Sequence, residues 1–118
     1  MVGSPGRPAP QAALSLRLMG ALPYVPAETQ DDIEAAAPWY ERERSGLGTH
    51  FIAELDRLID RIGSDPAQFP VVDAPVRRAL LHRFPYAVYF VSADPGGYST
   101  ILAVLHQHRD PDAWRNRL

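Results

Sequence analysis

Two segments in the first half of the chain have the hydrophobic spacing of amphipathic helices. The second carries an apolar stripe at helical intervals: Leu47, Phe51, Leu55, Leu58, Ile59 and Ile62. The first is predicted to begin at Thr29, because threonine is a favourable N-cap residue. Pro38 is predicted to kink that helix or end it early, because proline lacks the backbone N–H that a helix interior requires. The short glycine-containing connection between the two segments predicts an antiparallel helical pair.

The spacing of apolar residues changes to alternation in the second half of the chain. Residues 66–75 contain three prolines and are predicted to be a loop. Three strands are predicted beyond this loop: residues 76–83, 86–92 and 99–107. Residues 94–97 form a strong turn sequence before the last strand, and residues 20–27 could hold a short edge strand interrupted by two prolines. The resulting β-α-α-β-β-β order predicts an α+β fold, with a helical hairpin packed on a mainly antiparallel sheet.

The length of 118 residues suits a single domain with one hydrophobic core. Residues 1–18 are rich in proline and glycine, so we predict a disordered N-terminal tail followed by a folded domain at residues 19–118. We hypothesise that the native protein starts at Met19, which the intact mass of the native protein would test. The last residues, 110–118, are predicted to form a short irregular or helical tail that Trp114 packs down.

Composition excludes several classes of function. The chain has no cysteine, so it has no disulfide, thiolate metal site or cysteine nucleophile. All twelve basic residues are arginine, which excludes lysine chemistry. The sequence contains no apolar span long enough to cross a membrane and no secretory signal, and we predict a cytoplasmic protein. The net charge of −2 combines an acidic middle at residues 23–75 with a basic segment at residues 76–118.

Candidate chemistry is concentrated in that basic segment, which contains seven arginine and histidine candidates: Arg77, Arg78, His82, Arg83, His106, His108 and Arg109. Alternate residues of a strand share a face, which predicts three pairs: Arg78 with His82, Arg77 with Arg83, and His106 with His108. Such a cluster could bind phosphate and transfer a proton near neutral pH. The alternative is a solvated sheet face whose charges only maintain solubility.

Other residues are interpreted as structural. His106 and His108 could be two metal ligands completed by His82 or Asp110, but zinc sites usually show a fuller ligand pattern, and we predict no metal and no cofactor. Seven aromatic residues are expected to pack in or against the core: Trp39, Tyr40, Phe51, Phe84, Tyr86, Tyr89 and Trp114. Five acidic residues are interpreted as helix-cap and surface charges: Asp31, Asp32, Glu34, Glu41 and Glu43.

Taken in order, several short motifs resemble the RelE/ParE superfamily of type II toxin–antitoxin toxins, often called plasmid stabilisation proteins. The motifs of the helical hairpin are Asp32–Ala36, Trp39–Glu41, Gly46–Gly48 and Phe51. Those of the loop and strands are Asp65–Pro66, Phe69–Pro70, Val76–Leu80, Arg83–Tyr86 and Val88–Phe90. The C-terminal signature is His106-x-x-Arg109-Asp110-Pro111 followed by Trp114. The resemblance covers residues 20–118 and implies the same β-α-α-β-β-β fold.

The resemblance implies a bacterial cytoplasmic toxin that blocks growth and is neutralised by a cognate antitoxin, and it allows a heterotetramer of the two proteins. ParE-like members inhibit DNA gyrase and are not nucleases. The segments Trp39–Glu41 and Phe84–Tyr86, together with the absence of lysine, favour this branch. Residues for binding the target or the antitoxin would then be Arg77, Arg78, Arg83, His108 and Arg109.

RelE-like members instead cleave mRNA on the ribosome, which is the alternative function. In that case Arg78 and Arg83 would bind phosphate, His106 would act as acid or base, and Arg109 would stabilise the transition state. Whether the chain is an enzyme therefore depends on the branch to which it belongs. A second alternative is a non-toxic protein-binding module.

Overall fold

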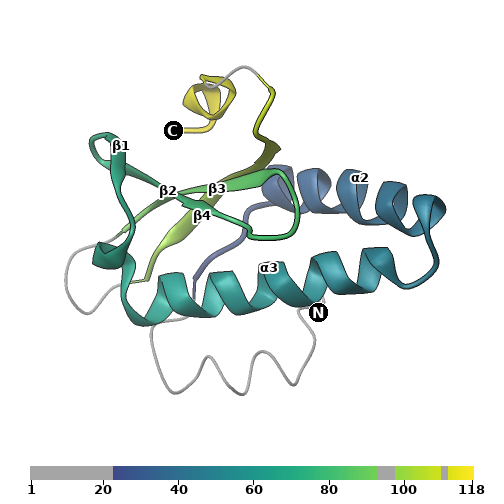
Figure 1. Cartoon of the computed structure of the whole chain (residues 1–118). Coiled ribbons are helices and arrows are strands. Elements are labelled where there is room, and N and C mark those ends of the chain that lie inside the picture. Colours follow the sequence, from purple (N-terminus) through teal and green to yellow (C-terminus); the bar gives the residue numbers. More distant parts are fainter. Residues whose placement is uncertain (1–22, 93–97, 110–111) are drawn as a thin grey trace, which may run out of the picture.

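Two helices cover one face of a four-stranded antiparallel sheet in the computed structural model, which describes residues 23–92, 98–109 and 112–118 (Figure 1). The helices are α2 (Ala27–Glu43) and α3 (Leu47–Ser64), and short 3₁₀ segments lie at η1 (Pro66–Gln68) and η2 (Ala113–Arg117). The strands, adjacent in chain order, are β1 (Val71–Asp73), β2 (Val76–Leu80), β3 (Tyr86–Val91) and β4 (Thr100–His106). The predicted α+β class is therefore confirmed.

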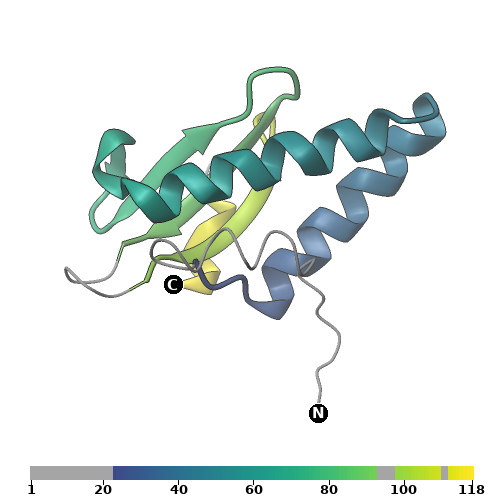
Figure 2. The same cartoon turned by 90° about the horizontal axis from the view of Figure 1, so that it is seen from below.

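The helical hairpin is closed by one acidic side chain. The Glu41 carboxylate accepts hydrogen bonds from the backbone N–H groups of Gly46 at 2.9 Å and Gly48 at 3.0 Å. These bonds satisfy donors at the start of α3 that would otherwise lack partners. Gly46 has a φ of 89°, which favours glycine, and a Cβ at Gly48 would lie 2.6 Å from the Ala37 carbonyl oxygen. Figure 2 shows the two helices meeting at this connection.

The prediction that Thr29 caps the first helix is wrong, and the helix does not end early at Pro38. The helix begins at Ala27 with Pro26 in the N-cap position, so Thr29 lies inside the first turn and is fully buried. Its hydroxyl contacts the Ile101 carbonyl oxygen at 2.7 Å and that of Leu102 at 2.8 Å. The helix also continues through Pro38 to Glu43. The missing hydrogen bond is tolerated because Pro38 lies on the exposed side of the helix, while Ala36 and Tyr40 on the other side are buried and stabilise it by packing.

The sheet differs from the expectation mainly at its margins. The three predicted strands are present but shorter, and β2 ends at Leu80. The predicted loop at 66–75 contains η1 and the strand β1, which pairs with β2. Among the described residues before the helices, only Tyr24 pairs with the sheet, through an isolated parallel bridge to Thr100. No full strand therefore precedes the helices in the described residues. The predicted tail at 1–18, the proposed start at Met19 and the turn at 94–97 lie outside the described residues.

The sheet buries apolar side chains on both faces. On the helix side, Tyr40, Phe51 and Phe84 form an aromatic cluster with ring centroids 4.8–5.4 Å apart, and Tyr86 contacts it. On the opposite face, where Figure 1 shows the C-terminal segment, Trp114 of η2 stacks on Tyr89 with centroids 5.9 Å apart. Six of the seven aromatic residues predicted to be structural therefore lie in or against the core.

Trp39 is the exception among the predicted core aromatics, because half of its side chain is exposed. The adjacent Tyr40 occupies the position of α2 that faces the sheet, and consecutive helical residues cannot share a face.

Neither α2 nor α3, nor any other helix in the described part of the chain, has the length and hydropathy of a membrane-spanning segment.

Candidate functional site

The predicted cluster of arginine and histidine residues is divided among three places in the fold. Because β2 ends at Leu80, His82 and Arg83 lie in the connection to β3 and do not continue the alternation of the strand. Because β4 ends at His106, His108 lies in the following turn. The expectation that these residues would pair along strand faces is therefore wrong, although His106 and His108 remain neighbours.

The first place is the end of β4. The ring of His106 lies edge-on to that of Tyr86, with ring centroids 5.3 Å apart. The centroid of the His108 ring lies 5.1 Å from that of His106. The backbone N–H of His108 donates a hydrogen bond of 3.1 Å to His106 Nδ1, and that of Arg109 donates to the His106 carbonyl oxygen at 2.9 Å. An accepting Nδ1 places the proton of the neutral ring on Nε2. His106 can therefore donate a proton or hydrogen bond from Nε2.

The phenol of Tyr86 completes this group. Burial raises the pKa of Tyr86 above its usual value of 10.0, the positive charge of Arg109 opposes that shift, and the negative charge of Asp32 adds to it. The hydroxyl is therefore protonated at neutral pH and can act as a hydrogen-bond donor. His106, His108, Arg109 and Tyr86 together form what we call the β4-end cluster.

The second place is the sheet face opposite the helices. Arg78 lies on β2 directly across from Tyr89 of β3, which in turn stacks on Trp114. The Nε atom of Arg78 is buried and makes no hydrogen bond among the described residues. Buried polar atoms are rarely left without a partner, so this cation is the best candidate on this face for contact with an anion. The neighbouring Arg77 instead donates to the Phe69 carbonyl oxygen at 2.6 Å, which is a structural role.

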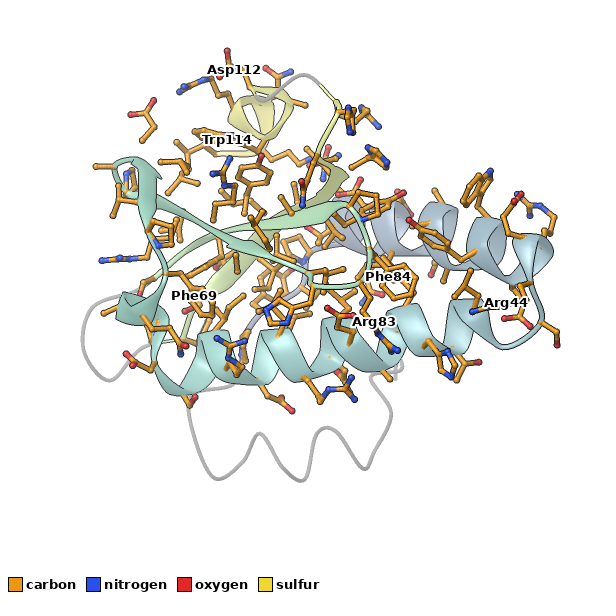
Figure 3. The ribbon with its side chains drawn as sticks, viewed as in Figure 1. Arg44, Phe69, Arg83, Phe84, Asp112 and Trp114 are labelled. Carbon is orange, nitrogen blue, oxygen red and sulfur yellow. The ribbon has the colours of Figure 1, made fainter. Side chains whose placement is uncertain are left out.

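The third place is the side of α3, where Arg83 lies next to Phe84 (Figure 3). Glu54 of α3 accepts hydrogen bonds from the backbone N–H groups of His82 and Arg83. The Nε atom of Arg83 is 3.6 Å from the same carboxylate. Of the four predicted catalytic residues, the structure therefore brings only His106 and Arg109 together.

Several polar residues make tertiary hydrogen bonds that the sequence analysis did not predict. Asp32 accepts the backbone N–H of Val104 at 2.9 Å and binds Arg117 at 2.5 and 3.0 Å, with side chains only 12% and 19% exposed. Asp32 is thus more than a helix-cap charge, and it covers the outer edge of β4 together with Thr29. These partners are 72 to 85 residues apart, so no local pattern could have revealed them.

The two neighbouring histidines, His106 and His108, have no further metal ligand beside them in the described residues. In the part of the chain that the structure describes, no three histidine, cysteine, aspartate or glutamate side chains are grouped so that they could hold a metal ion. Asp110, considered as a further ligand, lies outside the described residues. No family model matches the chain, and a search of curated proteins finds no match to it.

Proposed function

We propose that the chain is a toxin of the ParE-like branch of the RelE/ParE superfamily, acting on DNA gyrase in the bacterial cytoplasm and neutralised by a cognate antitoxin. The support from the sequence is the ordered series of motifs from Asp32 to Trp114. The support from the structure is a helical hairpin packed on an antiparallel sheet whose last three strands follow one another in chain order. Both are compatible with the β-α-α-β-β-β order of that superfamily, apart from the N-terminal strand and the additional strand β1.

One observation favours gyrase over the ribosome as the target. A nuclease of the RelE type would need its phosphate-binding and proton-transferring residues around one scissile phosphate. Arg78 lies on the sheet face opposite the helices, and Arg83 is paired with Glu54 on α3. Within the described residues, no hydrogen bond or ring contact joins either arginine to His106. Dispersed cationic residues suit docking to a protein better than catalysis.

The β4-end cluster keeps ribosome-dependent mRNA cleavage as the second candidate. His106 accepts a hydrogen bond at Nδ1 and so presents Nε2 as a donor, and the backbone N–H of Arg109 bonds to the His106 carbonyl oxygen. A nuclease of this kind would be centred on His106, Tyr86 and Arg109, and would not require Arg83.

The test is to induce the chain alone in a bacterial host and pulse-label DNA and protein synthesis within minutes. The gyrase proposal expects DNA synthesis to fail first, with a DNA-damage response, and expects His106→Ala to retain toxicity. The nuclease alternative would be established if protein synthesis failed first and His106→Ala abolished that failure. The urea unfolding midpoint of the variant must be unchanged, so that the loss cannot be attributed to misfolding. Continued growth with both syntheses intact would contradict both and leave a binding module.

A further inference from the structure

A pocket of about 280 Å³ lies between α3 and the end of β2, on the side of the molecule where Arg83 is labelled in Figure 3. Arg57 and Arg61 of α3 line one wall, and Arg83 lines the other. The pocket also has apolar lining from Leu58 and Leu81, both of which are buried. Small-ligand sites typically combine such an apolar surface with a few convergent polar groups.

The charges that line the pocket are mainly positive. Three guanidinium groups face a single carboxylate, that of Glu54, so the lining carries a net charge of +2 with His82 neutral. Glu54 is already occupied by the backbone N–H groups of His82 and Arg83 and by the Arg83 side chain. Asp56 and Asp60 belong to the same helix but do not line the pocket.

The three arginines have donors to spare. The Arg57 side chain makes no hydrogen bond or ion pair among the described residues. Arg61 is oriented by one hydrogen bond of 2.9 Å to Gln68 and lies over the Phe69 ring at 5.3 Å, which leaves its remaining N–H groups for another partner. Arg83 is held through Nε, so its terminal nitrogens are free to reach an anion.

We propose that this pocket binds a phosphomonoester with a small apolar or aromatic organic group. A phosphomonoester carries close to two negative charges at neutral pH, which balances the charge of the lining. Planar guanidinium groups bind phosphate oxygens through paired hydrogen bonds. Leu80 lies at the pocket with 45% of its surface exposed and offers a contact for the organic group. This ligand site goes beyond the proposed toxin function and does not depend on it.

The experiment titrates the full chain with phenyl phosphate, and separately with inorganic phosphate, by calorimetry at physiological salt. We expect one saturable site for phenyl phosphate that is weakened about tenfold or more by Arg57→Gln, since a charge-assisted bond is lost. The matched control is Arg44→Gln, an exposed arginine at the far end of the hairpin (Figure 3). It removes the same charge and should leave the dissociation constant unchanged.

A second variant keeps the proposal testable if Arg57→Gln perturbs folding, which the urea midpoint would reveal. Leu80→Ser should weaken the binding of phenyl phosphate and leave the affinity for inorganic phosphate unchanged, because only the ester has an organic group to contact Leu80. Absence of saturable binding at millimolar ligand overturns the proposal. Equal losses of affinity for phenyl phosphate in Arg57→Gln and Arg44→Gln overturn the proposal as well, since they indicate general charge attraction. Equal affinities for the ester and inorganic phosphate overturn the assignment of an ester.

Discussion

Thr29 provides the most direct test of how α2 is attached to the sheet. Its hydroxyl is fully buried and has a single proton to share between the carbonyl oxygens of Ile101 and Leu102. Thr29→Val preserves the shape of the side chain and removes only the hydroxyl. After this change the Leu102 carbonyl still accepts a bond of 3.2 Å from Arg117, whereas the Ile101 carbonyl loses its Thr29 donor.

The expected cost follows from that difference. Leaving one buried acceptor without its partner destabilises a protein by about 1–3 kcal/mol. For a loss of about 2 kcal/mol and a urea dependence of about 2 kcal/mol per molar, the unfolding midpoint falls by about 1 M. The control is Thr49→Val on the exposed surface of α3, which should change stability by no more than about 0.5 kcal/mol.

Thr29→Asp distinguishes this role from that of a helix cap. At an N-cap, aspartate is at least as favourable as threonine, so the variant would be as stable as the parent protein. In the observed position it would bury a carboxylate against two carbonyl oxygens, which costs several kcal/mol. Urea unfolding followed by circular dichroism measures both substitutions. Undiminished stability of Thr29→Asp, or equal effects of the two valine substitutions, would refute the reasoning.

Three further predictions concern packing, charge and pH. Gly48→Ala should lower stability by about 1–3 kcal/mol in urea unfolding, because its Cβ would clash with the Ala37 carbonyl and force the helices apart; an unchanged midpoint would contradict the close approach. Asp32→Ala should cost about 2–4 kcal/mol in urea unfolding by leaving the mostly buried Arg117 without its carboxylate partner, and an Asp32→Ala/Arg117→Met double variant should recover part of that loss. Burial raises the pKa of Tyr40 above 10.0, so the unfolded chain loses the phenolic proton first and stability should fall only above about pH 10. Tyr40→Phe should reduce this loss of stability at alkaline pH, as measured by urea unfolding. An equally steep fall of stability in the variant would disprove the role of Tyr40.

The periodicity of apolar residues was a reliable guide to the elements whose burial is regular. The stripe from Leu47 to Ile62 predicted α3 with its buried residues, and alternation predicted β3 and β4 to within one residue at most ends. It was a poor guide where a tertiary contact compensates for an unfavourable local sequence. Residues 66–75 look like a loop because of their prolines, yet β1 forms there by pairing with β2.

The candidate site was only half predictable. Residue types and position along the chain pointed to His106, His108 and Arg109, which are close because a tight turn follows β4. Whether Arg83 would join them depended on where β2 ended, whereas Arg78 is placed by its position within β2, opposite Tyr89. Beyond that end, the backbone of the connection between β2 and β3 bonds to Glu54 of α3, which lies 28 residues earlier in the chain.

The α+β class, the helical hairpin and most of the core can be inferred from the amino-acid sequence, because they follow from periodic burial and from turn-forming residues over short distances. The partners of the polar side chains become visible only in the folded protein. Thr29, Asp32 and Glu41 all resemble ordinary helix-end or surface residues in the sequence, yet they bond to the edge of β4 and to the start of α3. A short polar side chain has the same local signature at a cap as in a buried contact, and the fold alone brings its distant partner within reach.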